Sequence, residues 1–168
     1  MKVPSPLELT RFLRSADPLP SLALGFGSGL LLAVFLASPP NSSLTLLPFR
    51  EALEAVLHWE LPIFLAIALL GLGRLPILPR LVLLLRSLIW GYGSLRIFVD
   101  VGQSFLYFQY VLGGGLTLIP LCCLTKLAVD TAQGTGSLHG PRLYDYLCRC
   151  LLYWGLVLLT LPLRLWGG

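Results

Sequence analysis

Residues 81–101, LVLLLRSLIWGYGSLRIFVDV, decide the fold class of this chain. The stretch is almost entirely apolar, and about 20 such residues in an α-helix are enough to cross the ~30 Å hydrocarbon core of a bilayer. Its charged interruptions, Arg86, Arg96 and Asp100, are few and widely spaced. The segment therefore predicts a membrane-spanning helix.

Four more apolar segments flank this one. They are Leu22 to Ala37, Leu61 to Leu72, Phe105 to Leu124 and Leu147 to Leu165. The chain of 168 residues is 56% hydrophobic and 12% charged, about half of the ~25% charge of soluble domains. A chain this short cannot shield so much apolar surface in one water-soluble core. We expect an all-α polytopic protein of the cell membrane, a single integral membrane domain over 1–168 with about five transmembrane helices.

The basic residues indicate the orientation, because Lys and Arg are enriched in the cytoplasmic loops of membrane proteins. With five spans and a cytoplasmic N-terminus, Arg50, Arg96 and Arg164 fall outside. Eight basic residues fall on the cytoplasmic side, namely Lys2, Arg11, Arg14, Arg74, Arg80, Lys126, Arg142 and Arg149. A four-span layout would spoil this bias, so we expect five spans and the N-terminus in the cytoplasm.

The segments outside the spans differ in character. Residues 1–20 have prolines and an acidic residue after their basic residues and no convincing cleavage site, so we expect a cytoplasmic leader rather than a secretion signal. Part of this leader is either an amphipathic helix on the membrane surface or a disordered tail. Residues 125–146 are polar and contain glycine, which predicts a cytoplasmic loop.

Glycine and proline give two of the spans special features. In the first span, Gly25, Gly27 and Gly29 form a smooth strip where another helix can approach closely. The fourth span carries Gly113-Gly114-Gly115 and Pro120. Because proline removes a helix hydrogen bond, we expect the fourth helix to be broken.

The segment 48–60 predicts a helix of a different kind. Its apolar residues recur at helical intervals, so we expect an amphipathic helix along the outer membrane interface rather than across the bilayer. Its titratable side chains include Glu51, Glu54, His58 and Glu60. Two interpretations remain open: a solvated face that anchors the second span, and a surface that docks a partner protein.

Arg86 lies at membrane depth, where a charge costs at least ~2.5 kcal/mol. Its long side chain can snorkel to the cytoplasmic headgroups or pair inside the bundle. Partners open to it are Asp130, Asp145 and the C-terminus of a broken helix. Arg96 and Asp100 are one helical turn apart and can pair with each other.

No catalytic constellation is evident in the sequence. Cys122-Cys123 and the pair Cys148 and Cys150 lie on the same side of the predicted membrane, and four sulfurs can bind a soft metal. Cysteines on apolar helices more often serve as small packing residues. The basic residues are scattered rather than gathered in a stripe with aromatic residues. We therefore expect no enzyme activity, no cofactor, no metal site and no nucleic-acid partner.

The segment 61–112 follows the pattern of a known family. A Gly-rich helix end is followed by a proline, then by a cation and a Gly-aromatic pair, at Gly71, Pro76, Arg86, Gly91 and Tyr92. This order resembles the stage II sporulation protein M family of multi-span membrane proteins. In that family a lysine stands at the position of Arg86 and a glycine at that of Ser87.

The resemblance implies a non-enzymatic role in sporulation. Members of the family anchor a machine with two peptidoglycan-degrading enzymes, stage II sporulation proteins D and P, which drives engulfment of the forespore. The chain would then be a membrane scaffold, with lipid around it and membrane-associated proteins docked at 48–60. The alternative is a small transporter or permease subunit that uses Arg86, Asp100 and the broken fourth helix. Assembly into an oligomer is compatible with both.

Overall fold

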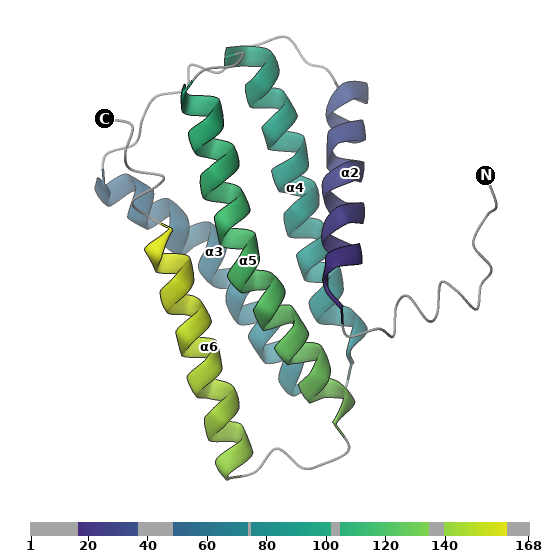
Figure 1. The fold of residues 1–168 in the computed structure, drawn as a ribbon, viewed down its shortest axis with the longest axis vertical. Helices are drawn as coiled ribbons and strands as arrows, with labels where there is room; N and C mark the ends of the chain where they lie inside the picture. Colours follow the sequence, from purple (N-terminus) through teal and green to yellow (C-terminus); the bar gives the residue numbers. More distant parts are fainter. Residues whose placement is uncertain (1–16, 37–48, 74, 102–104, 135–139, 161–168) are drawn as a thin grey trace, which may run out of the picture.

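Five α-helices make up the part of the chain that the computed structural model describes, residues 17–36, 49–73, 75–101, 105–134 and 140–160 (Figure 1). No strand occurs within these ranges. The helices are α2 (Leu19–Phe35), α3 (Phe49–Leu72), α4 (Ile77–Val101), α5 (Phe105–Gln133) and α6 (Pro141–Leu159). The all-α expectation is confirmed.

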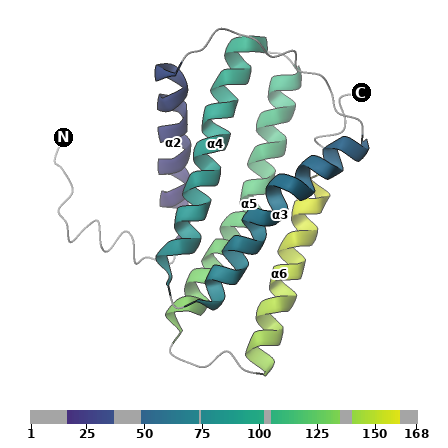
Figure 2. The same ribbon diagram turned by 180° about the vertical axis from the view of Figure 1, so that it is seen from behind.

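Consecutive helices run in opposite directions, so the bundle has two ends (Figure 1). At one end α2, α4 and α6 begin and α3 and α5 finish; at the other end the order is reversed. Helix α5 contacts α3, α4 and α6, whereas α2 packs chiefly against α4. Helix α3 is strongly tilted against α4, and its first residues lean out past the end of α6 (Figure 2).

The expected boundary between an interfacial helix at 48–60 and a second span at 61–72 is wrong, because α3 is one continuous helix from Phe49 to Leu72. It passes through Pro62 without ending. Proline is tolerated inside helices where neighbouring groups satisfy the backbone, as in membrane bundles.

The expected break in the fourth span is also wrong. Helix α5 continues through Gly113-Gly114-Gly115 and Pro120 as far as Gln133. The glycines serve packing instead, since a side chain at Gly114 would collide with the indole of Trp90. With α5 ending at Gln133 and α6 beginning at Pro141, most of the polar segment 125–146 is helical rather than loop.

Two of the three glycines in the strip on α2 pack against another helix, as expected. A Cβ atom at Gly25 or at Gly29 would collide with the backbone of α4, so α2 and α4 are in backbone contact there. Gly27 faces open space instead. The small residues that α2 buries recur every fourth position, at Ser21, Gly25, Gly29 and Ala33, a spacing typical of closely packed membrane helices.

Large apolar side chains are exposed on all five helices. Representative exposed residues, one from each helix, are Phe35, Leu69, Leu85, Phe105 and Leu151. The interior includes polar residues, among them Glu60, Arg80, Ser87, Thr117 and Thr125. Two helical stretches, Ile77–Val99 and Tyr107–Gln133, are long and apolar enough to span a bilayer. The shorter apolar helices are Leu19–Phe35 and Leu57–Leu72.

Candidate functional site

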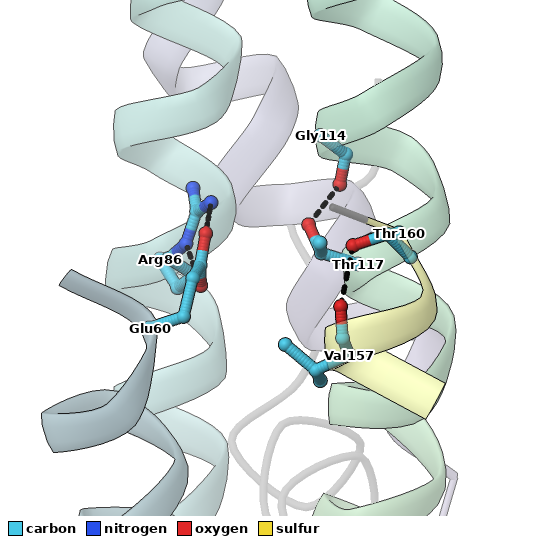
Figure 3. A network of polar contacts seen from close by, with 6 residues as sticks. All are labelled: Glu60, Arg86, Gly114, Thr117, Val157 and Thr160. Atoms are coloured by element: carbon cyan, nitrogen blue, oxygen red, sulfur yellow. Dashed lines mark hydrogen bonds and ion pairs between the residues drawn. The ribbon is translucent and has the colours of Figure 1, made fainter. Parts of the chain in front are cut away.

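An ion pair between α3 and α4 lies inside the bundle (Figure 3). Nη2 of Arg86 donates to Oε1 of Glu60 at 2.5 Å, and Nε of Arg86 donates to Oε2 of the same carboxylate at 3.1 Å. The Glu60 side chain is 2% exposed and that of Arg86 is 12% exposed. The guanidinium thus holds both carboxylate oxygens, the geometry in which arginine binds a carboxylate most strongly and most specifically.

The ion pair lies near the middle of both helices, because Glu60 is close to the midpoint of Phe49–Leu72 and Arg86 is close to that of Ile77–Val101. Buried threonines from α5 and from the end of α6 lie in the same region of the bundle (Figure 3). Thr117 donates its hydroxyl to the carbonyl of Gly114, and Thr160 donates to that of Val157, each at 2.7 Å. These hydroxyls are therefore satisfied by carbonyls of their own chain segments.

The chemistry of the ion pair favours a structural task. An isolated charge in an apolar interior is very costly, whereas a well-aligned pair presents no net charge and each ion binds the other through two charged hydrogen bonds. Because both oxygens of Glu60 bind one guanidinium, sliding α3 along α4 would break two charged hydrogen bonds. The ion pair therefore fixes the register of α3 against α4.

None of the three partners predicted for Arg86 from the sequence is the partner that it has in the structure. Asp145 pairs with Arg149 at 3.0 Å on the exposed surface of α6, and Asp130 is exposed on α5. The guanidinium of Arg86 binds the carboxylate of Glu60 instead. Asp100 lies in α4, but its side chain is outside the described part of the structure.

The sequence analysis predicted Glu60 on an outer surface because it placed a helix boundary between residues 60 and 61. Once α3 is read as one helix, Glu60 falls at its middle, as Arg86 does in α4. The two residues then lie near the middle of neighbouring antiparallel helices. A search for opposite charges at matching positions along adjacent antiparallel helices would have found this pair.

The four docking candidates separate into different environments. Glu54 is exposed and pairs with the exposed Arg50 at 3.0 Å, and His58 is exposed as well. Glu51 lies in α3, but its side chain is outside the described residues. Glu60 is buried in the ion pair and is unavailable to a partner, which corrects the sequence-based expectation.

The first part of α3 differs from the rest of the helix. We call residues 49–59 the α3 arm. None of its described side chains is buried, and Trp59 is 72% exposed. From Glu60 onward the helix is packed into the bundle, with Phe64 and Ile67 in the core. The ion pair therefore lies where the arm joins the packed part of α3.

Two of the residues that carry the sequence resemblance, Gly71 and Gly91, lie at helix contacts. A Cβ atom at Gly71 would meet the Tyr146 hydroxyl and Ala128, and one at Gly91 would meet the backbone of Phe26. The hydroxyl of Tyr146 also donates to the carbonyl of Ala68 at 2.6 Å, which ties α6 to α3. Pro76, just before α4, and Tyr92 within it are half-buried. The two glycines therefore serve the close packing of the helices.

The four cysteines do not form a common site. Cys122, Cys123, Cys148 and Cys150 are all free thiols. Cys150 is buried in the core and Cys123 and Cys148 are exposed. Within the described ranges, no three His, Cys, Asp or Glu residues gather in a way that could hold a metal ion.

Comparison with protein-family models, with curated proteins and with solved structures found no match for this chain. The resemblance to the stage II sporulation protein M family therefore rests on the residues of the segment 61–112 quoted above.

Proposed function

We propose that this chain is a five-span integral membrane protein, with its N-terminal segment in the cytoplasm, that acts as a scaffold for partner proteins on the outer side. One observation carries the proposal. Large apolar side chains are exposed on every helix, and a carboxylate–guanidinium pair lies inside the bundle. This distribution suits a lipid environment. There the backbone and the charged groups form their hydrogen bonds inside the protein, and the apolar side chains face the hydrocarbon chains of the lipid.

The alternating directions of the helices support the membrane topology. They bring the beginnings of α4 and α6 to the end of the bundle where α5 finishes (Figure 1). The basic residues of this half are Arg80, Lys126, Arg142 and Arg149. Arg50 and Arg96 belong to the other half. Such an asymmetry is typical of a protein whose Lys- and Arg-rich side faces the cytoplasm.

The α3 arm supports the scaffold role. It presents the exposed side chains of Glu54, His58 and Trp59 beyond the core, and the Glu60–Arg86 pair fixes its base to α4. A surface held on a rigid helix loses little conformational freedom when a partner binds. By the family resemblance, the partners are peptidoglycan-degrading enzymes.

Two features that the transporter alternative requires, a broken fourth helix and an available Arg86, are absent from the described part of the structure. Helix α5 is continuous, so the broken helix that would line a substrate site is absent from this span. Arg86 is engaged by Glu60 rather than free to bind a solute. The scaffold is therefore the function that we propose.

Changing both Glu54 and His58 to alanine should abolish recovery of the partner while leaving membrane insertion intact. Both side chains are exposed on the α3 arm, so the change removes contact groups without opening the core. The measurement is affinity purification of the tagged protein in mild detergent from its native cells, with partners quantified by mass spectrometry.

The matched control changes Asp130 and Asp145 to alanine. Both are exposed acidic residues of the opposite half of the bundle. Their loss should leave every partner in place. Unchanged recovery from the Glu54 and His58 variant would exclude the α3 arm as the docking surface.

A further inference from the structure

Helix α3 is poorly suited to cross a bilayer by itself. Its apolar part, Leu57–Leu72, is shorter than the apolar stretch Ile77–Val99 of α4. A crossing needs about 20 residues, so a span that finishes where α3 finishes begins at roughly residue 53 and takes in His58 and Glu60. Helix α3 therefore cannot cross without carrying titratable side chains into the hydrocarbon.

The carboxylate of Glu60 is the main obstacle to the insertion of α3. A charged side chain inside a bilayer is strongly disfavoured unless it is paired or reaches water. The sequence of α3 contains one Lys or Arg, which is Arg50, and Arg50 pairs with Glu54 on the exposed first part of the helix. The residue that neutralises Glu60 must therefore come from another helix.

Helix α4 supplies that residue. Arg86 binds both carboxylate oxygens of Glu60, through Nη2 and Nε (Figure 3). The two helices are antiparallel, and only residues 73–76 separate the end of α3 from the start of α4. Two helices joined by so short a connection form an αα-hairpin. The ion pair can therefore form within the hairpin, before α5 and α6 are in place.

The dependence runs in one direction, from α3 to α4. The stretch Ile77–Val99 is long and apolar enough to span by itself. Arg86 lies in the first half of α4, which faces the cytoplasm in the proposed topology, so an unpaired guanidinium can reach toward the headgroups on its long side chain. Glu60 has a shorter side chain and lies in the shorter span. Loss of its partner should therefore affect α3 more than α4.

We propose that α3 enters the bilayer only together with α4, as a helical hairpin whose buried charge the Glu60–Arg86 ion pair neutralises. This inference rests on the proposed five-span topology. The ion pair then decides whether α3 spans the bilayer at all, in addition to fixing its register against α4. Without Arg86 the carboxylate of Glu60 is unpaired, and α3 stays on the outer side. Without Glu60 the obstacle is gone, and α3 spans.

Thiol labelling between α3 and α4 tests this proposal. In the full chain without its four native cysteines, a single cysteine replaces Leu75, which is 61% exposed. A membrane-impermeant reagent is added to intact cells, and labelling is divided by the labelling after permeabilisation, so that the amount of protein cancels. In the parent, position 75 should be labelled only after permeabilisation. Arg86→Leu should raise outside labelling by about tenfold or more, since an unpaired charge disfavours insertion by at least that factor.

Two further variants separate the unpaired carboxylate from other causes. Adding Glu60→Leu to Arg86→Leu removes the carboxylate as well and should restore the protection of position 75. The matched control is Arg149→Leu, which removes an arginine of the same half of the bundle from an exposed ion pair with Asp145. It should leave position 75 protected.

The remaining outcomes contradict the proposal in distinguishable ways. If position 75 stays protected in Arg86→Leu, or is labelled equally in the double variant, hairpin insertion is overturned while the five-span topology stands. Equal labelling in Arg149→Leu also overturns it, because the effect then follows the loss of any positive charge. Labelling of position 75 from outside in the parent contradicts the five-span topology, and the hairpin proposal fails with it.

Discussion

Replacing Arg86 with leucine should destabilise the folded protein by about 3–5 kcal/mol, the usual cost of removing one partner from a buried ion pair. The carboxylate of Glu60 would keep its burial, since its side chain is 2% exposed, and would lose both charged hydrogen bonds. The measurement is the free energy of unfolding in mixed micelles, followed by tryptophan fluorescence as a denaturing detergent is titrated in.

The double variant, with leucine at both Glu60 and Arg86, is the control for this result. A buried ion pair replaced by apolar residues of similar volume is often close to neutral in stability, so the double variant should be much more stable than Arg86→Leu alone. If the two single changes added up in the double variant, the two residues would not be energetically coupled, and the ion pair would not fix α3 to α4.

Gly29→Ala should be the most disruptive single-methyl change in the bundle. A Cβ atom at this position would collide with the carbonyl oxygen of Leu88 and would lie 2.8 Å from the backbone nitrogen of Tyr92. Neither backbone atom can move without shifting α4. We therefore expect a loss at the upper end of the ~1–3 kcal/mol that overpacking costs, in the same unfolding measurement.

Gly27→Ala is the matched control, two residues away on the same helix. Nothing lies within 4 Å of a Cβ atom at Gly27, and alanine favours the helix over glycine by roughly 0.5–1 kcal/mol. This variant should be as stable as the parent protein or more stable. Equal effects of the two changes would contradict the backbone contact between α2 and α4.

The sequence predicted the helices well where hydrophobicity alone defines them. The span expected at 81–101 is helix α4, Ile77–Val101, and the one expected from Leu22 to Ala37 is α2, Leu19–Phe35. In both cases a long apolar run is bounded by proline at one end. The close approach at Gly25 and Gly29 also followed from spacing alone.

The errors come from residues that have two physical roles. Proline usually ends a helix in a water-soluble protein, but α3 runs through Pro62 and α5 runs through Pro120. Glycines at 113–115 can break a helix or admit a large ring, and here Trp90 lies against Gly114. Arg80, expected in a cytoplasmic loop, is 3% exposed in the first turn of α4. Local sequence cannot choose between such roles, because the neighbouring helix decides.

The candidate site was missed for a related reason. Arg86 was recognised as a charge that needs a partner, but its partner is 26 positions away in the sequence. The pairing depends on α3 being one helix that runs antiparallel to α4. Only the arrangement of the helices brings the carboxylate of Glu60 to the guanidinium.

Accessibility of single cysteines to a membrane-impermeant thiol reagent on intact cells tests the five-span topology most directly. In a background without the four native cysteines, single cysteines replace Ser15, Arg50, Gly134 and Gly168. We predict that the cysteines at 50 and 168 are labelled from outside, whereas those at 15 and 134 are labelled only after the membrane is permeabilised. Labelling of positions 15 and 168 from the same side would contradict an odd number of spans.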